Sequence, residues 1–557
     1  MLAFALSCTQ TTPAPVDEPP TSLPDEHGID PLDMLTDGDE AAPYPRPGAP
    51  VPAYPPTPQP RPIPAVGTIV GIWEVGAAPS RDSTAVRHAL ATMGIPSESI
   101  ARPSQLPAYR VVVVVGELTD ATITKDAADR LAAALQAGTA VLLVAPRATR
   151  LYALAGIQAV APMGDRRELL LADEPSPLLE ELRSIAISKL PLTGAGAVTP
   201  TVGYAVQDGG ARVLARFDDG SAALVQRGAL YVLGLRTQYY LDLLSGLGLG
   251  FSDEYTNRHY IQGDLLPLLL RRFYLLHAPS PRVRRTAPDG HRAAVILTHD
   301  CDSPYSAQIM HHFAEAERAR GVRATYLVTT SAYRNGLMGA VYTRAMIHGL
   351  RRLVADGFDV GSHSFGHFPD FHRLPVALDG ESAANYLPRY DQGQTQGGSL
   401  VGEIQVSRYL LEEDLGIRVA AFRPGFLLTP PAYYEQLVAG GYLRSSVRAG
   451  GLVRTNFPHR AVRSRPGGYD IYPVIEYPLA LSDRGLDEGN IPERVAQWLA
   501  VVDRNLVTGA PTLLLVHPSR RPGRTQALVA FLDALQGRDV WVGDLSRFAA
   551  FYEEQGF

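Results

Sequence analysis

Residues 293–302 read AAVILTHDCD, a short apolar run that ends in two aspartates separated by one residue. The run has the composition of a buried strand, and in sheets of parallel strands the ligand sites lie beyond the carboxyl ends of the strands. Asp300 and Asp302 can both face a cleft if the chain leaves strand geometry there. Because Asp-x-Asp is also common in turns, this pair needs support from elsewhere in the chain.

Three more polar motifs follow apolar stretches further along the chain. Residues 358–367 read FDVGSHSFGH, residues 422–426 read FRPGF, and residues 513–518 read LLLVHP. His363 and His367 have the i, i+4 spacing that places two imidazoles on one face of a helical turn, where they can bind one metal ion. Each motif by itself is weak, but four of them in one fixed order are much stronger.

Together, the four motifs resemble those of the polysaccharide deacetylase family (NodB homology, carbohydrate esterase family 4). The segment THDCD at 298–302 matches an Asp-x-Asp variant of the first motif, HSFGH at 363–367 the second, RPGF at 423–426 the Arg-Pro motif, and LVH at 515–517 the last. The resemblance covers about residues 290–557. It implies a distorted (β/α) barrel with fewer than eight strands for this part of the chain.

The resemblance also implies a metal site. Carried over position by position, the metal ligands are Asp302, His363 and His367. Two imidazoles and one carboxylate with open positions are also the donor set that a catalytic zinc site needs on chemical grounds. We therefore expect one divalent metal ion as cofactor, with Zn2+ ahead of Co2+, Ni2+ and Mn2+.

The catalytic residues follow from the same resemblance. Asp300 matches the general base, His517 the general acid, Arg423 the arginine that keeps the base ionised and oriented, and Phe426 the residue whose backbone N–H binds the oxyanion. In such a site the base takes a proton from the water that attacks the acetyl carbonyl, and the acid protonates the departing amine. The products are acetate and a free amino sugar.

The sequence departs from the family pattern at several points. Cys301 stands between the two aspartates, where we expect it to pack as a small apolar residue rather than to bind metal. The family's Asp and Trp motif has no clear match, so the acid that orients His517 is not identified, and Glu476 and Asp483 are the candidates. Among the histidines that match no family ligand, His299 is the one we expect to line the pocket.

A long insertion, residues 368–400, separates the second motif from the third and is rich in aromatic residues, Gly and Gln. We expect it to form a loop over the active site in which Phe371, Tyr386 and Tyr390 stack on sugar rings. An ordinary surface insertion is the equally weighted alternative.

These residues predict a metal-dependent hydrolase that removes N-acetyl or O-acetyl groups from an envelope or extracellular polysaccharide. Two alternatives stay open. The same fold could hydrolyse small amides or cyclic imides, or the chain could be a catalytically inactive, carbohydrate-binding envelope protein. Because the metal ligands and the acid–base pair are all present, we favour the enzyme.

Residues 67–250 form a second unit, in which apolar strands alternate with helices. Such alternation implies a mainly parallel sheet covered on both faces. The expected strands are 67–74, 110–115, 140–146, 211–216, 222–226 and 229–234, and the expected helices are 82–94 and 124–138.

The layout of this unit resembles the class I glutamine amidotransferase-like, flavodoxin-like α/β fold. That family uses a nucleophilic cysteine, and no cysteine occurs between Cys8 and Cys301. Activated-cysteine chemistry is therefore excluded here, and we expect a scaffold or binding module. Residues 251–289 are predicted to be a connecting helix and linker to the deacetylase-like domain.

Residues 9–66 are predicted to be a disordered linker. They contain 17 of the 46 prolines and nine acidic residues against two arginines, so they cannot bury enough apolar surface to offset their ordering entropy. Residues 1–8 resemble the end of a truncated bacterial lipoprotein signal, with Cys8 as the lipidation site. This predicts a location in the cell envelope, lipid-anchored at the outer membrane or periplasmic, or secretion.

The overall composition is that of a folded protein. The chain has 557 residues, of which 46% are hydrophobic and 19% charged, with a net charge of −6 and no basic block. Nucleic acid is therefore not expected as the main partner. No run of 18 apolar residues occurs, so we expect membrane contact only through a lipid anchor. The expected partner is an N-acetylated polysaccharide, and the oligomeric state is not predicted.

Overall fold

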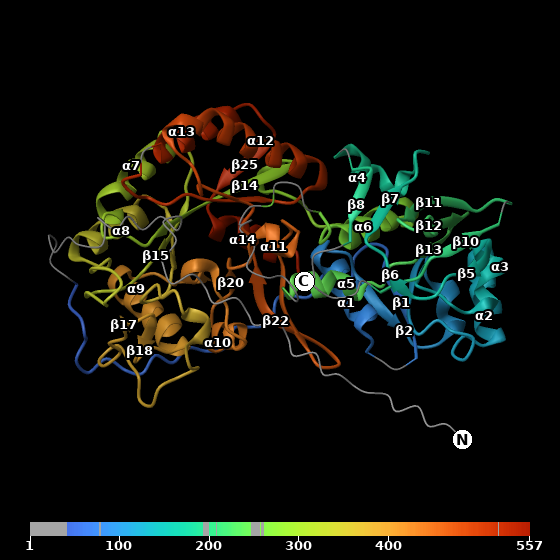
Figure 1. Cartoon of the computed structure of the whole chain (residues 1–557), viewed down its shortest axis with the longest axis horizontal. Coiled ribbons are helices and arrows are strands. Elements are labelled where there is room, and N and C mark those ends of the chain that lie inside the picture. The colour runs from blue at the N-terminus through green and yellow to red at the C-terminus, as the bar shows by residue number, and fades with distance from the viewer. Residues whose placement is uncertain are drawn as a thin grey trace, which may run out of the picture.

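The computed structural model shows two α/β lobes (Figure 1). The N-terminal lobe contains the elements from β1 to α6, drawn in blue to green, and the C-terminal lobe those from β14 to α14, drawn in yellow-green to red. The predicted signal at 1–8, Cys8 and the first part of the predicted linker lie outside the described residues. The structure describes residues 42–76, 79–185, 187–192, 200–207, 209–246, 257, 261–521 and 523–557.

The N-terminal lobe is built on one large mixed sheet. The first five strands in sheet order, β2-β1-β3-β4-β13, are parallel and follow the order of a flavodoxin-like sheet. The remaining pairings are antiparallel. The amidotransferase-like assignment itself stays a prediction. In sheet order the strands are β2 (Ser97–Ile100), β1 (Val70–Val75), β3 (Val111–Gly116), β4 (Ala140–Val144), β13 (Leu230–Leu233), β12 (Ala222–Arg227), β11 (Arg212–Phe217), β7 (Glu168–Leu171) and β8 (Lys189–Pro191), with β10 (Tyr204–Val206) and β5 (Ile157–Val160) off this path.

The helices of this lobe begin at clear capping residues. The side chains of Ser80 and Thr124 accept hydrogen bonds from backbone N–H groups in the first turns of α1 and α2, as expected for N-caps. Both helices lie where the alternation pattern predicts them. The helices are α1 (Arg81–Thr92), α2 (Lys125–Gln136), α3 (Tyr152–Ala155), α4 (Glu180–Ser184), α5 (Gln238–Leu244) and α6 (Leu265–His277).

The C-terminal lobe contains a second large sheet, and all its pairings except that of β21 with β22 are parallel. The pairings form one path from β21 to β23, and none found in the described residues joins the two ends, so a closed barrel is not confirmed. In sheet order the strands are β21 (His459–Arg465), β22 (Gly468–Glu476), β20 (Arg444–Ser445), β19 (Ala421–Phe422), β16 (Asp359–Ser362), β15 (Thr325–Val328), β14 (Ala293–Cys301), β24 (Thr512–Leu515) and β23 (Leu481–Ser482), and β25 (Val540–Gly543) also pairs with β14.

Helices cover this sheet, and alternate residues of β14 enter separate hydrophobic clusters on its two faces. Val295 and Leu297 belong to one cluster, whereas Ala294 and Ile296 belong to the other. The helices are α7 (Ser306–Arg318), α8 (Arg344–Ala355), α9 (Ser407–Leu415), α10 (Tyr433–Ala439), α11 (Gly450–Val453), α12 (Ile491–Thr508), α13 (Arg524–Leu535) and α14 (Leu545–Glu553). In the described residues, no helix combines the length and apolarity needed to cross a membrane.

The two lobes pack against each other over a shared core. The main cluster of the N-terminal lobe includes Phe457 and Val462 from the C-terminal lobe. The stretch after α6 also differs from a free linker. Arg284 in this stretch is buried at 8% exposure and stacks on the rings of Tyr552 and Phe557, each 4.2 Å away.

Residues 42–66, which we call the N-terminal strap, correct the prediction of a free linker over 9–66. The strap is extended, as its prolines require, but it lies against the C-terminal lobe. Arg46 pairs with Asp414 at 2.6 Å, and the backbone N–H of Thr57 donates to Val438 O at 2.8 Å. Composition misleads here because prolines lose little entropy on ordering, so a few anchoring side chains suffice on a surface that is already folded.

Candidate metal-binding active site

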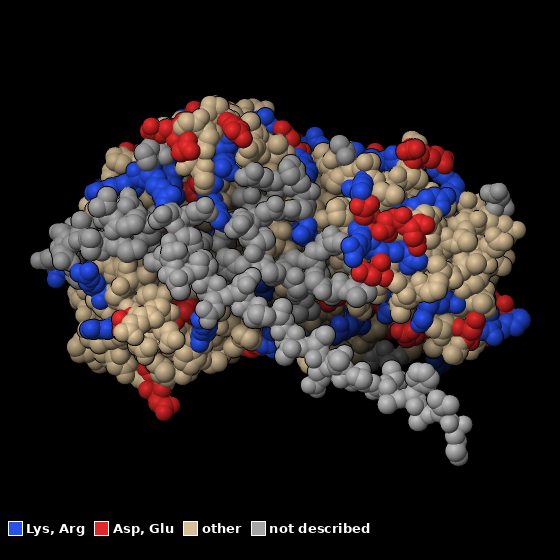
Figure 2. Space-filling view, in the orientation of Figure 1, with Lys and Arg blue, Asp and Glu red and all other residues tan. Residues whose placement is uncertain are grey.

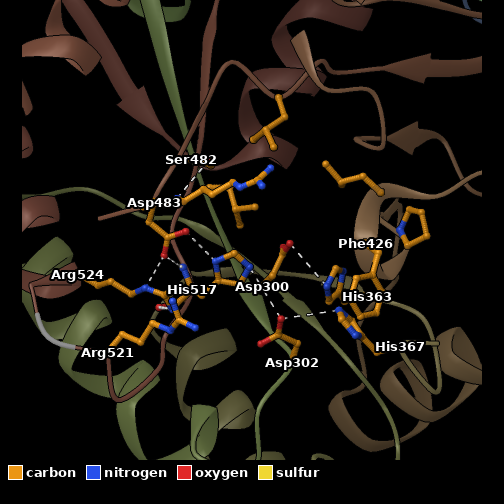
Figure 3. Close-up of a pocket in the computed structure, with 16 residues that line it drawn as sticks. Asp300, Asp302, His363, His367, Phe426, Ser482, Asp483, His517, Arg521 and Arg524 are labelled. Atoms are coloured by element: carbon orange, nitrogen blue, oxygen red, sulfur yellow. Dashed lines mark hydrogen bonds and ion pairs between the residues drawn. The ribbon is translucent and has the colours of Figure 1, made fainter. Parts of the chain in front are cut away.

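The carboxyl ends of five parallel strands of the C-terminal lobe bring the predicted site residues together. β14 ends at Cys301, β16 at Ser362, β19 at Phe422, β23 at Ser482 and β24 at Leu515. All the residues predicted from the motifs follow one of these ends closely or, for Asp300, lie within the strand. All of them except the fully buried Arg423 line a pocket of about 620 Å³ that is open to solvent (Figure 3). Its lining residues are Asp300, Asp302, His363, His367, Pro424, Phe426, Leu427, Leu479, Ser482, Asp483, Arg484, Gly485, Leu515, His517, Arg521 and Arg524.

β14 is longer than predicted and sets the direction of its side chains. The strand runs to Cys301, so Asp300 still has strand geometry and its side chain alternates with that of Cys301. Asp300 lines the pocket, whereas Cys301 is fully buried in the hydrophobic cluster on the opposite face. Burial raises the pKa of the Cys301 thiol. This agrees with the prediction that Cys301 packs as an apolar residue.

Three predicted ligands lie close enough to bind one metal ion. One donor atom each from Asp302, His363 and His367 lies within 4.8 Å of the other two. All three residues are buried, at 3%, 2% and 3% exposure. His367 Nε2 is 3.7 Å from Asp302 Oδ2, and His363 Nε2 is 3.6 Å from Asp300 Oδ2.

The two histidines do not lie on a helical turn, so that part of the prediction was wrong. They belong to a loop in which Ser364 and His367 both have positive φ values, 67° and 53°. The backbone N–H of His367 donates to the hydroxyl of Ser364 at 3.1 Å, which helps to hold this unfavourable conformation. Gly425 is required beside this loop, because a Cβ there would lie 2.6 Å from the His367 ring.

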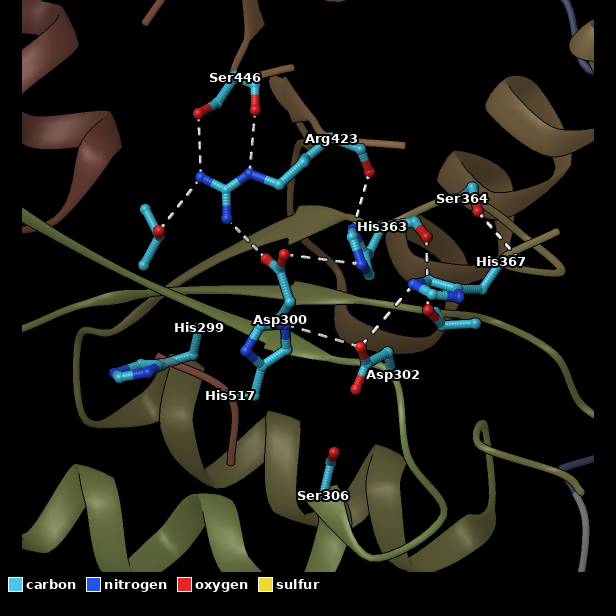
Figure 4. Close-up of polar contacts among 12 residues, drawn as sticks. His299, Asp300, Asp302, Ser306, His363, Ser364, His367, Arg423, Ser446 and His517 are labelled. Carbon is cyan, nitrogen blue, oxygen red and sulfur yellow. Dashed lines mark hydrogen bonds and ion pairs between the residues drawn. The ribbon is translucent and has the colours of Figure 1, made fainter. Parts of the chain in front are cut away.

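The orientation of the His363 ring suits a metal ligand. Its Nδ1–H donates to the backbone carbonyl of Arg423 at 2.9 Å, which leaves the Nε2 lone pair facing the two aspartates (Figure 4). Such a hydrogen bond from the remote ring nitrogen is the usual arrangement around a metal-binding histidine. Burial lowers the pKa of His363, so the ring favours the neutral form that can bind a cation. The donor set and its burial therefore fit a divalent metal ion.

Glu403 supports the histidine loop from behind and was not predicted. It lies in a π-helical segment, Gly402–Val406, that precedes α9. Its side chain accepts hydrogen bonds from the N–H of Gly366 at 2.8 Å and from the hydroxyl of Tyr386 at 2.9 Å. Burial raises the pKa of Glu403 to about 7. No motif spacing marks this residue, because its partners lie on other segments of the chain.

Arg423 holds Asp300 in a buried ion pair. Its Nη1 donates to Asp300 Oδ1 at 2.7 Å, and its other nitrogens donate to the hydroxyl of Thr298 and to the carbonyl and hydroxyl oxygens of Ser446 (Figure 4). Burial alone would raise the pKa of Asp300, but the positive charge of Arg423, with contributions from His363 and His517, lowers it. Asp300 is therefore ionised and fixed in direction.

Asp483 orients His517, which lies across the pocket from His367 and Phe426 (Figure 3). The Nδ1–H of His517 donates to Asp483 Oδ1 at 2.8 Å, and its backbone N–H donates to Oδ2 at 2.9 Å. Arg524 Nε is 2.8 Å from the same Oδ2. Of the two acids considered from the sequence, Asp483 fills this position, whereas Glu476 accepts from the backbone N–H of Val447.

Phe426 lines the pocket beside the histidine loop. Its ring packs on that of His367 with centroids 4.7 Å apart, and its φ is 56°. Figure 3 shows its side chain on the His367 side of the pocket, opposite Asp483 and Arg524. Its expected role, a backbone N–H donor to the oxyanion, stays a prediction.

Several other expectations about the pocket were wrong. His299 does not line it: the ring is buried on the Cys301 face of β14, 2.7 Å from Glu317 Oε1, and points away from the cluster (Figure 4). The aromatic residues of 368–400 do not lie free above the site either. Phe371 and Tyr386 are buried in the core of the lobe, and Tyr390 stacks on Phe368. Large aromatic residues in an insertion gain more from burial than from exposure, which explains the difference.

No protein-family model matches the sequence, and no curated protein matches it. Among solved structures, a protein from Mycobacterium smegmatis assigned to the polysaccharide deacetylases is 19% identical, covers 49% of this chain and 95% of its own, and has a TM-score of 0.35. A family 4 acetyl xylan esterase from Clostridium thermocellum, in complex with a cobalt ion, is 15% identical over 47% of this chain and 95% of its own, with a TM-score of 0.28.

A third structure resembles more of the chain. Agd3, a carbohydrate deacetylase, is 11% identical, covers 88% of this chain and 87% of its own, and has a TM-score of 0.39. At these identities and scores the likeness by itself assigns no residue a role. The chain is thus similar to a polysaccharide deacetylase and an acetyl xylan esterase over about half of its length, and to a carbohydrate deacetylase over most of it.

Proposed function

We propose that the chain is a metal-dependent hydrolase that removes acetyl groups from a glycan, with N-acetyl groups as the first substrate and O-acetyl groups as the second. The observation that carries this proposal is the placement of Asp300 and His517 in one pocket with the cluster of Asp302, His363 and His367. A proton acceptor, a metal site and a proton donor around one pocket suit hydrolysis of an amide or ester.

The role of the metal site would be to make the acetyl carbonyl more electrophilic. Asp302, His363 and His367 would hold one divalent ion, and such an ion supplies Lewis acidity toward the acetyl carbonyl and the attacking water. Zn2+ is the first choice for this donor set, with Co2+, Ni2+ and Mn2+ as alternatives.

Asp300 is the proposed general base. Arg423 keeps its carboxylate ionised, and the carboxylate faces the metal site, 3.6 Å from His363 Nε2. It takes a proton from the water as the water oxygen forms a bond to the acetyl carbon. The backbone N–H of Phe426 is the proposed donor to the oxyanion that results.

His517 is the proposed general acid. With Nδ1–H bound to Asp483, its Nε2 is the atom that faces the pocket, 3.9 Å from Asp302 Oδ2. Burial would lower the pKa of His517, but the charge of Asp483 and its hydrogen bond raise it, so the protonated ring is available near neutral pH. The proton passes to the leaving nitrogen as the C–N bond breaks, which gives acetate and an amine.

We also propose that the protein acts in the cell envelope, where its glycan substrate is found, with Cys8 as a lipid attachment site. This part rests on the sequence alone, because Cys8 lies outside the described residues.

Metal content and acetate release from the full-length chain test the proposed function together. We expect about one divalent ion per chain after incubation with Zn2+, and loss of that ion in His363→Ala. His312→Ala is a matched control, because His312 is exposed on α7 and should leave the metal in place. Acetate release from hexa-N-acetylchitohexaose, the hexamer of N-acetylglucosamine, should require the ion.

Asp300→Asn separates metal binding from catalysis. It should keep the ion and lower the rate of acetate release about 10²–10⁴-fold, since only the general base is lost. A full-length chain that binds no ion, or that releases acetate equally well in Asp300→Asn, would contradict the proposal.

A further inference from the structure

The histidine loop, residues 363–367, has an aromatic residue at its centre. Phe365 lies midway between the proposed ligands His363 and His367, and its side chain is buried at 0% exposure. Because Ser364 and His367 both have positive φ values, the conformation of the loop is unfavourable without support from outside. The residues that enclose Phe365 therefore help to set the positions of both histidines.

Three tyrosine rings enclose the ring of Phe365, and we call them the tyrosine cage. Tyr386 meets the phenyl ring edge to face, with centroids 5.2 Å apart. Tyr44 and Tyr333 pack on it in tilted arrangements, with centroids 5.3 and 6.1 Å away. Tyr333 and Tyr386 belong to the C-terminal lobe, whereas Tyr44 belongs to the N-terminal strap. One wall of the cage thus comes from a segment that is remote in sequence from the other two.

Tyr44 also reaches the histidine loop through hydrogen bonds. Its hydroxyl donates to the backbone carbonyl of Tyr386, and the hydroxyl of Tyr386 donates to Glu403 at 2.9 Å. Glu403 in turn accepts from the N–H of Gly366, in the histidine loop, at 2.8 Å. Two routes therefore connect Tyr44 to this loop, namely ring packing on Phe365 and a relay of hydrogen bonds to Gly366.

Backbone hydrogen bonds fix the strap on either side of Tyr44. The N–H of Ala42 donates to Tyr342 O at 3.3 Å, and the N–H of Arg46 donates to Ala383 O at 3.0 Å. Both acceptors belong to the C-terminal lobe. Tyr44 thus enters the cage from a segment that is itself held in place, so its position depends on the docking of the strap.

Local contacts, and not a broad charged surface, dock the strap. Residues 42–66 contain two charged residues, Arg46 and Arg61. Figure 1 draws the strap in blue along the C-terminal lobe, and on the face shown in Figure 2 acidic and basic side chains are interspersed over both lobes. Charges of both signs on that face give little long-range attraction. Docking therefore depends on contacts such as those of Tyr44.

Resting on the proposed function, we infer that Tyr44 is a positioning residue for the metal site, and that docking of the strap and binding of the metal ion support each other. The docked strap holds the histidine loop through Phe365 and Gly366, and thereby keeps the two histidines close to Asp302. Thermodynamic linkage requires a reverse effect of equal size. An ion that fixes the two histidines must also favour the docked strap.

The Zn2+ affinity of the full-length protein, measured by competition with a chelator, tests the effect of the strap on the metal site. Tyr44→Ala removes one wall of the cage and should weaken Zn2+ binding about tenfold, because the ligands lose part of the support that orients them. Tyr44→Phe keeps the ring and loses one hydrogen bond, so it should recover most of the affinity.

Tyr54→Ala is the matched control, because Tyr54 is the other tyrosine of the strap. Its ring packs on the guanidinium of Arg408, 4.1 Å from the ring centroid. We expect this variant to bind Zn2+ as the parent protein does, even where its Tm falls. Equal losses of Zn2+ affinity in Tyr44→Ala and Tyr54→Ala would point to a general loosening of the lobe and overturn the role of Tyr44.

Hydrogen exchange of the strap tests the reverse effect without catalysis. The N–H groups of Ala42 and Arg46 are bonded to the C-terminal lobe, and Zn2+ should slow their exchange severalfold in the parent protein. Zn2+ should leave the exchange unchanged in His363→Ala, which lacks one of the proposed ligands. If Zn2+ does not slow the exchange of the strap in the parent protein, the inference is wrong.

The inference and the proposed function fail in different ways. If the parent protein releases acetate and Tyr44→Ala binds Zn2+ equally well, the enzyme stands and the role of Tyr44 does not. If Tyr44→Ala binds Zn2+ more weakly but the parent protein releases no acetate, the coupling stands and the proposed hydrolase does not. A parent protein that binds no Zn2+ would overturn both.

Discussion

Asp483 holds His517 at two points: its Oδ1 accepts from the ring Nδ1–H at 2.8 Å, and its Oδ2 accepts from the backbone N–H at 2.9 Å. One carboxylate thereby sets both the tautomer of the ring and the path of the loop that carries it. Burial would raise the pKa of Asp483, but the charges of Arg524 and His517 and these hydrogen bonds lower it well below its usual range. Asp483 is thus ionised throughout the working pH range.

Replacing Asp483 by Asn should move the alkaline limb of the pH–activity profile to lower pH. Asp483 raises the pKa of His517, so its loss lowers that pKa, and less of the ring is protonated at any pH above neutrality. We expect kcat to fall about 10–100-fold at pH 8 and less at pH 6, as measured by acetate release. Asp487→Asn, on an exposed residue of the same loop, should leave the profile unchanged. An unshifted alkaline limb in Asp483→Asn would argue against the acid role of His517.

Replacing Arg423 by Gln should act on the acidic limb instead. Without the guanidinium, burial is no longer offset, the pKa of Asp300 rises, and the base becomes ionised only at higher pH. The acidic limb should move to higher pH. The fold should also lose about 3 kcal/mol at neutral pH, because a buried carboxylate loses its partner.

The double variant Arg423→Gln/Asp300→Asn checks the cause of that stability loss. Since the buried charge is removed with its partner, the double variant should be more stable toward urea than Arg423→Gln alone. Additive losses would mean that Arg423 stabilises the fold through Ser446 and Thr298 rather than through Asp300.

Replacing Glu403 by Ala should weaken metal binding, although Glu403 is not a proposed ligand. Its hydrogen bond to the N–H of Gly366 holds the loop in which His367 takes a positive φ. Loss of such support lowers metal affinity by about 10–100-fold. Competition with a zinc chelator measures the effect, and Glu413→Ala, on an exposed residue of α9, is the control. Rescue in Glu403→Gln, which keeps one acceptor oxygen, would assign the effect to the hydrogen bond.

Loss of the strap anchors should destabilise the C-terminal lobe. Tyr44 packs on Tyr333 and Phe365 with centroids 5.8 and 5.3 Å away, and the buried Thr57 hydroxyl donates to Tyr442 O. Tyr44→Ala/Thr57→Val should lose about 3 kcal/mol, measured as a drop of several degrees in Tm. Val51→Ala, at an exposed site on the strap, is the control. Equal Tm values for Tyr44→Ala/Thr57→Val and Val51→Ala would mean that the Tyr44 and Thr57 anchors contribute nothing to stability.

The motif residues could be predicted from the sequence because each stands next to a local signal. An apolar run that ends in polar residues marks a strand end, and parallel strand ends meet at one edge of a sheet. Asp302, His363 and His517 follow such runs, and the structure places all three around one pocket. The strands and the helices after Ser80 and Thr124 are likewise products of local pattern and capping.

Other features depend on contacts that no local pattern reveals. Asp483 and Glu403 meet their partners across 34 and 37 residues, and only the fold brings them together. The spacing of His363 and His367 also fits a helix, and it is the packing around Gly425 that selects a turn with positive φ. His299 was placed wrongly for the same reason: it belongs to the THDCD motif, but strand alternation directs its side chain to the face opposite Asp300.

The strap has a consequence for how the chain is synthesised. Tyr44, Arg46 and Thr57 have partners 342 to 385 residues further along the chain. Protein synthesis proceeds at about 5–20 residues per second, so roughly 20–80 s pass between the synthesis of the strap and the synthesis of its docking surface. Proline lacks the N–H that strand pairing needs, so a strap rich in proline resists aggregation during that delay. The proline-rich composition of the strap therefore suits its unbound state during synthesis as well as its bound state in the folded protein.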